Sequence, residues 1–276
     1  MPESTASSIP LRAEISRPRR GRWFQIFKPF DFEWNHAKLP IPGLPPQLAG
    51  LRIIHLTDLH VRGPWHDAYD QLLERIAAAD ADLLLFTGDF VDNKRNHTRA
   101  LPSVRRIAAG LRAKHGAYAI LGNHDRMHFL PRLIEAPVVE AICGERRTID
   151  INGASIELIG LPGAVRQDLP PDFAATMPPI AGDNTLRIVL SHFPDHLPRV
   201  AALKPHVFLA GHTHGGQVCL PGGIPIIKHD SLPRRYCRGI HRIGDTWLVV
   251  SRGFGATTLP LRIFCPPEVI EIELTT

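Results

Sequence analysis

The chain has 276 residues, of which 44% are hydrophobic, and a formal net charge of +5 at pH 7. A chain of this size and composition can bury a full core in one large or two modest domains, and it has no uninterrupted apolar run of about 18 residues, which excludes a transmembrane helix candidate. The mild positive charge suits an anionic ligand but is too small to indicate nucleic acid, so no nucleic-acid partner is expected.

The N-terminal sequence MPESTASSIPLRAEISRPRR has no apolar stretch after its charged residues. It does not have the pattern of a secretory signal, so the cytoplasm is the expected location. Residues 1–50 hold eight of the 26 prolines, and seven Lys/Arg against four Asp/Glu, which leaves a net charge of +3. This composition predicts a basic, aromatic, proline-rich arm over residues 1–50, ahead of a folded domain over residues 51–276.

The segment RPRRGRWFQIFKPFDFEW, residues 17–34, has two interpretations. Its mixture of arginines and aromatic side chains is typical of a peripheral contact with anionic lipid, here at the inner face of the membrane. The alternation of Phe30, Phe32 and Trp34 with polar residues is also typical of an edge strand that covers one face of a sheet. The sequence favours neither function nor structure strongly enough to discard the other.

From residue 51 onwards, the pattern predicts strands that alternate with helices. Apolar residues spaced i, i+3, i+4 and i+7 predict helices over 69–76 and 104–111, and a shorter helix follows Pro194-Asp195. Asn152-Gly153 and Gly244-Asp245 predict the turns of two hairpins, over 146–160 and 239–250. Apolar runs predict further strands at 51–56, 82–87, 117–121, 185–190, 206–210 and 268–274. The pattern indicates one α/β or α+β domain of helices packed on mixed sheets.

Polar groups directly follow five of these predicted strands. The five motifs, in chain order, are TDLH (57–60), TGDFVD (87–92), GNHD (122–125), SH (191–192) and GHTH (211–214). Because open α/β sheets bind ligands in the loops after the C-terminal ends of their strands, these groups are expected to converge on one rim. Any one motif alone could be a chance tripeptide, a turn or a polar loop, so only the ordered set supports a shared site.

The residue types limit the chemistry of this rim. Carboxylate, amide and imidazole groups without thiolates suit Mn, Fe or Zn rather than a structural zinc cage. In an extended chain, residues i and i+2 lie on the same face about 6.5 Å apart, so Asp58 and His60 can share one ion, and His212 and His214 can reach two. With one bridging carboxylate, the candidate ligands give two metal ions four contacts each: Asp58, His60, Asp89, Asn123, His192, His212 and His214.

In order and spacing, the set DLH … GDFVD … GNHD … SH … GHTHGGQV resembles the calcineurin-like metallophosphoesterase superfamily over residues 51–276. The stretches LPIPGLPPQLAGLRIIHLTDLH, GHTHGGQVCLPGG and SRGFGATTLPLRIFCPPEVIEIEL further resemble its bacterial YaeI/YkuE-type phosphodiesterase branch. This resemblance implies a four-layer α/β/β/α sandwich with a dinuclear metal site at the C-terminal ends of the strands.

The resemblance also implies a role for each motif residue. Asp58, His60 and His214 would bind the first metal ion, Asn123, His192 and His212 the second, and Asp89 would bridge them. A hydroxide that bridges the two ions would attack phosphorus in line. His124 would be the general acid that protonates the leaving oxygen, and Asp92 would orient it. In the protein phosphatase branch Arg-Gly follows GDFVD, whereas Asn93-Lys94 follow here, which argues against phosphoprotein specificity.

The expected function is therefore metal-dependent hydrolysis of a phosphoester, as a phosphodiesterase with two divalent ions (Mn, Fe or Zn) per chain. A lipid-linked pyrophosphatase of the UDP-2,3-diacylglucosamine type, a cyclic-nucleotide phosphodiesterase and an enzyme of phospholipid headgroups are alternatives that fold and metal site do not separate. A non-catalytic metal-binding scaffold is a further alternative, although no ligand is missing. Arg126 and Arg252 are candidates to bind the substrate phosphate, or else surface or ion-paired arginines.

Overall fold

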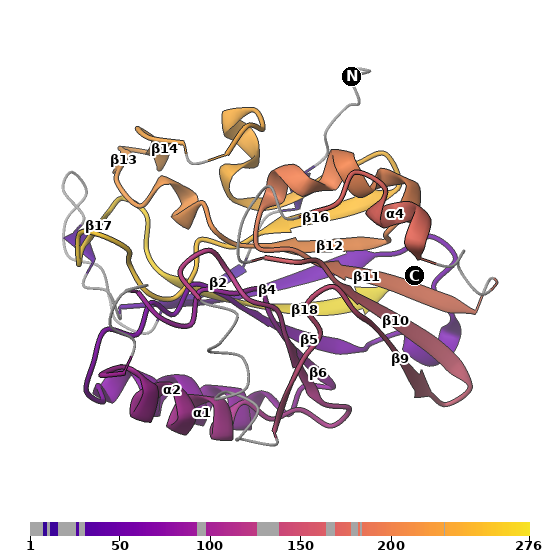
Figure 1. Cartoon of the computed structure of the whole chain (residues 1–276), viewed down its shortest axis with the longest axis horizontal. Helices are drawn as coiled ribbons and strands as arrows, with labels where there is room; N and C mark the ends of the chain where they lie inside the picture. The colour runs from indigo at the N-terminus through magenta and orange to yellow at the C-terminus, as the bar shows by residue number, and fades with distance from the viewer. Residues whose placement is uncertain are drawn as a thin grey trace.

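Two seven-stranded sheets stack at the centre of the molecule (Figure 1). The computed structural model describes residues 8–9, 12–15, 26–27, 31–92, 98–125, 138–163, 169–177, 182, 184–228 and 230–276. The first sheet has the order β2 (Arg12–Ile15), β4 (Glu33–Pro40), β18 (Glu268–Thr275), β5 (Arg52–Leu56), β6 (Leu83–Phe86), β7 (Ala117–Ala119), β8 (Val139–Ala141). The second has the order β1 (Ser8–Ile9), β15 (Gly239–Ile243), β16 (Thr246–Val250), β12 (Val207–Ala210), β11 (Thr185–Leu190), β10 (Ala154–Gly160), β9 (Arg146–Ile151).

Parallel strands make up the middle of each sheet. In the first sheet β5, β6, β7 and β8 run parallel, and in the second β10, β11, β12 and β16 do so. The carboxyl ends of parallel neighbours meet at the same edge of a sheet. The loops after β5, β6, β7, β11, β12 and β16 therefore gather at one end of the sandwich.

Helices cover the outer face of each sheet (Figure 1). The helices α1 (Asp67–Ala79) and α2 (Leu101–Gly110) pack on the first sheet, and α4 (Phe173–Thr176) and the 3₁₀ helix η4 (Pro194–Leu203) pack on the second. Successive strand side chains point to opposite faces, so Ile54 packs toward α1 and α2, whereas Ile53 packs between the sheets. The expected four-layer α/β/β/α sandwich is confirmed.

The segment predicted as an N-terminal arm contributes a strand to the first sheet. Glu33–Pro40 form β4, which lies between β2 and β18 and so is an inner strand rather than an edge strand. Phe32 and Trp34 are buried. The packed fold therefore begins before residue 51, because a long parallel pairing with β18, from Glu268↔Glu33 to Thr275↔Pro40, anchors this segment. Most of residues 17–34 lies outside the described residues.

The strands predicted from residue 51 onwards and both hairpins are present, with bounds that differ by at most two residues. The short helix predicted after Pro194-Asp195 is the 3₁₀ helix η4, in which Pro198 lacks an amide donor and Val200 leaves helical geometry. Periodicity did not reveal the two-residue strands, which are too short to have a period: β3 (Ile26–Phe27), β13 (Cys219–Leu220), β14 (Ile224–Pro225) and β17 (Arg262–Ile263). Among the described residues, no helix has both the length and the apolar character to cross a membrane.

Candidate metal centre

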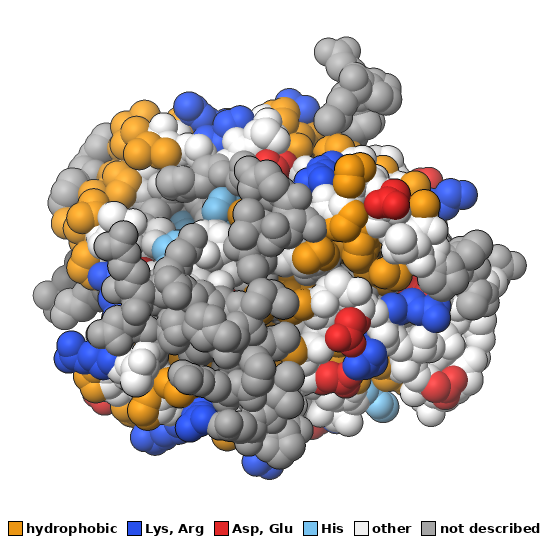
Figure 2. Space-filling model, viewed as in Figure 1, with side chains coloured by type: hydrophobic (Ala, Val, Ile, Leu, Met, Phe, Trp, Pro, Cys, Tyr) orange, Lys and Arg blue, Asp and Glu red, His pale blue; other side chains and the backbone are white. Residues whose placement is uncertain are grey.

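The polar residues after the central strands meet at one end of both sheets. Asp58 and His60 follow β5, Asp89 follows β6, and His212 and His214 follow β12. All five have a positive φ, between 44° and 67°, which non-glycine residues rarely adopt. Strained backbone gathered in one place is typical of a functional site. Figure 2 shows histidine side chains in a hollow on this face of the molecule.

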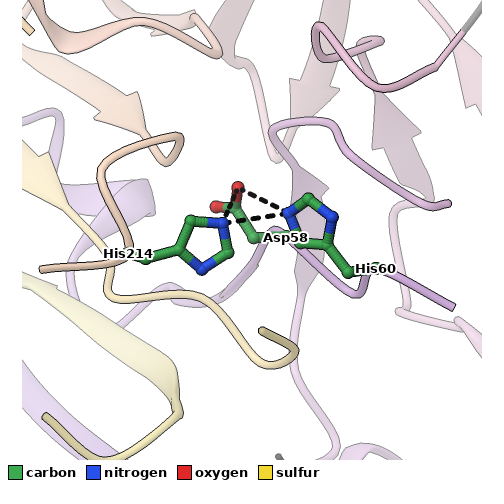
Figure 3. Close-up of side chains that lie close together, drawn as sticks. All are labelled: Asp58, His60 and His214. Atoms are coloured by element: carbon green, nitrogen blue, oxygen red, sulfur yellow. Dashed lines mark hydrogen bonds and ion pairs between the residues drawn. The ribbon is translucent and has the colours of Figure 1, made fainter. Parts of the chain in front are cut away.

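Asp58, His60 and His214 form a first cluster (Figure 3). Nε2 of His60 lies 2.9 Å from Nε2 of His214, and Oδ1 of Asp58 lies 3.7 Å from the former nitrogen and 3.4 Å from the latter. All three side chains are buried. Thr57 Oγ1 donates to Asp58 Oδ2 at 2.9 Å, and the backbone N–H of His212 donates to the same carboxylate. The aspartate is thus fixed between the loops that follow β5 and β12.

Asp89, Asn123 and His192 form a second cluster. Nε2 of His192 lies 3.3 Å from Oδ2 of Asp89 and 3.0 Å from Oδ1 of Asn123. Nδ1 of His192 donates to the carbonyl oxygen of Thr87 at 2.8 Å, which orients the ring. The ring of His212 lies 5.0 Å from that of His192, between centroids, so the fourth predicted ligand of this group lies beside it.

One oxygen of Asp89 faces both clusters. Its Oδ2 lies 3.5 Å from Nε2 of His60 and 3.3 Å from Nε2 of His192. Its Oδ1 accepts the backbone N–H of His124 at 2.7 Å. The carboxylate therefore occupies the position that a ligand shared between two neighbouring ions requires.

The electrostatics of the clusters keep the two aspartates ionised. Burial opposes ionisation of Asp58, but the imidazoles of His214 and His60 outweigh burial and hold the pKa of this carboxyl well below its usual range. The pKa of Asp89 is lowered in the same way, with His192 as its strongest partner. Burial lowers the pKa of His60 and of His192, yet the neighbouring carboxylates raise both to about 9. These buried carboxylates thus favour positive charge at the imidazole nitrogens.

The donor set fits divalent metal ions. Since the Nδ1 proton of neutral His192 is committed to Thr87, its Nε2 lone pair faces the oxygens of Asp89 and Asn123 with no hydrogen between them. Buried acceptors in such contact require a proton or a cation among them. Ligand atoms lie within 4.8 Å of one another in three buried or part-buried groups: Asp58/His60/His214, His60/Asp89/His124 and Asp58/Asp89/His192.

Gly211 permits the close approach of two ligand-bearing loops. A Cβ at this position would lie 2.2 Å from Oγ1 of Thr57 and 2.3 Å from Oδ2 of Asp58. We expect Gly211→Ala to displace Asp58, weaken Mn²⁺ binding, and destabilise the fold by about 2 kcal/mol, or about 5 °C in thermal midpoint. Calorimetric Mn²⁺ titration and thermal unfolding measure both effects. Gly63→Ala is the matched control, because its nearest neighbour is the flexible side chain of Arg99; equal losses in the two variants would contradict the prediction.

The ring of His124 lies at the edge of the clusters and is only partly buried. Its Nδ1 donates to the backbone carbonyl of Asp92 at 2.6 Å, which leaves Nε2 as the nitrogen available to a ligand. The sequence predicted orientation of His124 by the carboxylate of Asp92. In the structure that carboxylate lies instead 3.4 Å from Nδ1 of His60 and 3.3 Å from Nε of Arg62. Asp92 thus contacts His124 through its backbone and a predicted metal ligand through its side chain.

Asp125, the last residue of the GNHD motif, has a structural role that its motif did not predict. Its buried carboxylate accepts the backbone N–H groups of Asp89 at 2.8 Å, Phe90 at 3.0 Å and Gly122 at 3.0 Å. It joins the loop of Asp89 to the loop of His124. Burial, reinforced by the charge of Asp89, raises the pKa of Asp125 to about 7. Its position beside two predicted site residues was the signal that could have identified it.

Arg262 is a second residue that the sequence did not indicate. Its guanidinium is fully buried and lies behind His214. Nε donates to the carbonyl oxygen of Gly255 at 2.8 Å, Nη1 to that of His214 at 3.2 Å and Nη2 to that of Arg252 at 2.7 Å. One side chain thereby fixes the loops after β12 and β16. No sequence signal marks it, because its partners are backbone carbonyls.

The two arginines proposed for substrate phosphate have different outcomes. The guanidinium of Arg252 is buried and ion-paired with Glu33, at 2.8 Å, and with Glu268. The structure therefore supports the alternative of an ion-paired arginine, since two carboxylates already neutralise this cation. Arg126 lies outside the described residues.

Comparisons with known proteins agree with this geometry. A family model described as calcineurin-like phosphoesterase matches residues 51–216. The chain is 29% identical to the uncharacterized metallophosphoesterase YkuE of Bacillus subtilis, over 91% of this chain and 88% of that protein. It is 26% identical to the phosphodiesterase YaeI of Escherichia coli, over 82% and 83% respectively. It is 23% identical to the UDP-2,3-diacylglucosamine pyrophosphatase LpxG of Chlamydia muridarum, over 95% of each chain.

Proposed function

Because the chain belongs to the calcineurin-like phosphoesterase family, as its motifs predicted, we propose that this metallophosphoesterase is a phosphodiesterase with two divalent metal ions. The observation that carries the proposal is the meeting of buried carboxylates and imidazoles from both sheets, with ligand atoms within 4.8 Å of one another. Neither sheet alone supplies the set. The stacking of the two sheets is therefore what would create the site.

Two groups of side chains would hold the ions. Mn, Fe or Zn would suit these ligands, because the donors are carboxylate, amide and imidazole without thiolate. When bound, the ions would offset charge on the phosphoryl oxygens and lower the pKa of water so that it can act as the nucleophile. Asp58, His60 and His214 would hold one ion, Asn123, His192 and His212 the other, and Asp89 both.

His124 would supply the proton that the leaving oxygen needs. Its Nδ1–H is held by the carbonyl oxygen of Asp92, so Nε2 is the nitrogen that can carry a proton toward a substrate. The carboxylate of Asp92 would keep the ring of the ligand His60 in place. Asp125 would act at one remove, because it fixes the backbone of both Asp89 and the His124 loop. The chain thus supplies acid and positioning, and substrate phosphate would bind close to the two ions.

The physiological substrate has several candidates that share a phosphodiester or pyrophosphate link. Relatives carry the names phosphodiesterase and UDP-2,3-diacylglucosamine pyrophosphatase, and these two activities lead the candidates for this chain. Cyclic nucleotides and phospholipid headgroups share the same chemical link. Parallel assays on one representative of each class, with product identified by mass spectrometry, would rank them.

Metal removal provides the first test. We expect the purified chain to hydrolyse bis-p-nitrophenyl phosphate with Mn²⁺, to lose this activity in EDTA, and to recover it when Mn²⁺ is restored. Elemental analysis of the active protein should give two ions per chain. Well under two ions together with no hydrolysis of any substrate would overturn the proposal and support the non-catalytic scaffold instead.

A further inference from the structure

Exposed apolar side chains are concentrated beside the candidate metal centre. Among the described residues, all six large hydrophobic side chains that stand out as exposed, each 50–59% accessible, belong to the small strands and loops next to the loop of His214. We name this group the apolar rim; it consists of Ile26, Leu220, Ile224, Ile226, Ile227 and Leu259. Exposed large aliphatic residues that gather in one place mark an interaction surface, whereas scattered ones do not.

Backbone pairing makes the rim continuous. Leu220 of β13 pairs with Ile224 of β14 in a hairpin. Val218, next to this hairpin, forms a bridge with Ile263 of β17, and Ile263 pairs with Ile26 of β3. The amide N–H of Ile226 donates to the carbonyl oxygen of Val218, and the side chain of Gln217 donates to that of Leu259.

The apolar rim is joined directly to the candidate metal centre. His214 begins the one-turn 3₁₀ helix η5 (His214–Gly216), and the strand β13 follows three residues later. A Cβ on Gly216 would lie 2.5 Å from Cβ of Pro225, so β14 packs against the backbone beside His214. In Figure 2, hydrophobic side chains gather over β13 and β14, next to the hollow that contains the histidines.

The charge around the rim is positive. Residues 214–244 hold five Lys/Arg against one acidic residue. That acidic residue, Asp230, is buried, whereas Lys228, Arg234 and Arg235 are exposed. Arg234 and Arg235 lie in the 3₁₀ helix η6 (Arg234–Cys237), which follows the hairpin. An apolar centre bordered by cations complements a surface with an apolar interior and anionic headgroups.

From this juxtaposition we propose that the apolar rim docks on an anionic lipid bilayer, with the hairpin β13–β14 in the headgroup layer and the metal centre facing the membrane surface. Ile26 belongs to the segment 17–34, for which the sequence allowed both a strand and a lipid contact; the segment forms the strand β3, and Ile26 is exposed on the rim. A second protein with a matching apolar face would not account for the cationic border. The proposal goes beyond phosphodiester hydrolysis and does not depend on it, because binding is measured without turnover.

Vesicle sedimentation of the full-length chain tests the proposal. We expect the protein to sediment with vesicles of phosphatidylcholine that contain one third phosphatidylglycerol, and poorly with phosphatidylcholine alone. The double variant Ile226→Glu/Ile227→Glu should bind at least about tenfold more weakly, since two carboxylates replace inserted apolar side chains. Arg234→Gln/Arg235→Gln should weaken binding by about 25-fold at low salt, and the loss should shrink at high salt.

Matched variants distinguish the rim from other surfaces of the molecule. Ala77→Glu/Ala78→Glu adds the same charge at exposed positions of α1, on the outer layer beyond the first sheet, and should bind like the unmodified chain. Thermal unfolding of every variant verifies the fold. The proposal falls if the unmodified chain ignores anionic vesicles or if the isoleucine variant binds them undiminished. It also falls if Ile226→Glu/Ile227→Glu instead dissociates a dimer in sedimentation velocity, or if only Gln at Arg17, Arg19, Arg20 and Arg22 abolishes binding.

Discussion

Replacing Asp89 with asparagine is expected to lower kcat/KM for a phosphodiester by about 10³-fold, because the change removes about 4 kcal/mol of stabilisation from a site built around two ions. Oδ2 of Asp89 is the oxygen that lies within 3.5 Å of an imidazole of each cluster. An asparagine keeps the size of the side chain and can still accept the N–H of His124 through its Oδ1, but it lacks the negative charge. The two ions would lose the anionic ligand that they share.

Metal content and activity should therefore fall together in Asp89→Asn. Elemental analysis is expected to give fewer than two ions per chain, and added Mn²⁺ should restore little of the rate. Asp70→Asn is the charge-matched control, because Asp70 is a half-exposed residue of α1 that pairs with Arg106 outside the site. An Asp89→Asn protein that keeps two ions and the full rate would remove this residue from the centre of the mechanism.

The sequence predicted the candidate site better than it predicted the residues that support it. The ligand candidates directly follow apolar runs, so strand ends could be located from local pattern alone, and parallel strands bring such ends together. The supporting contacts join residues that are distant in sequence. Arg252 pairs with Glu33 across 219 positions, and this contact exists only because β4 and β18 are neighbours in the first sheet. No local pattern specifies that neighbour relation.

Contacts with backbone groups were equally hard to predict from the sequence. Asp125 and Arg262 act on main-chain N–H and C=O groups, which every residue has, so their partners leave no trace in the sequence. The same reason explains Asp92, whose carbonyl rather than carboxylate meets His124. Positive φ at Asp58 and His60 was also invisible, since the extended spacing used to predict their proximity assumes ordinary strand geometry. Side-chain chemistry was thus predictable, whereas the backbone conformation that aims it was not.

The position of β4 shows how composition can mislead about packing. Prolines on the C-terminal side of Trp34 and a net positive charge predicted an arm, but proline density describes the loop at residues 40–46 rather than the strand before it. Burial alternates along β4, with Trp34, Ala37 and Leu39 inside. Truncation at residue 38 would remove most of an inner strand, so tests of lipid binding need substitutions instead of deletions.

Replacing His124 with alanine is expected to separate proton transfer from metal binding. If Nε2 of His124 donates the proton to the leaving oxygen, kcat for an alkyl phosphodiester should fall by about 10³-fold, within the range observed for general acids. The loss should be smaller for bis-p-nitrophenyl phosphate, because p-nitrophenolate leaves readily without a proton. A difference between the two substrates is therefore a more specific signature than the loss of rate itself.

The metal content of His124→Ala decides between this role and direct ligation. The ring of His124 lies 4.7 Å from that of His60, between centroids, and its ligand atoms come within 4.8 Å of those of His60 and Asp89, so a role as metal ligand is geometrically accessible. A general acid can be removed without loss of the ions, whereas removal of a ligand lowers occupancy. We expect two ions in His124→Ala, and an unchanged rate in the exposed control His115→Ala. Equal losses for both leaving groups, together with fewer than two ions, would assign His124 to the metal shell and leave the proton donor to be found elsewhere.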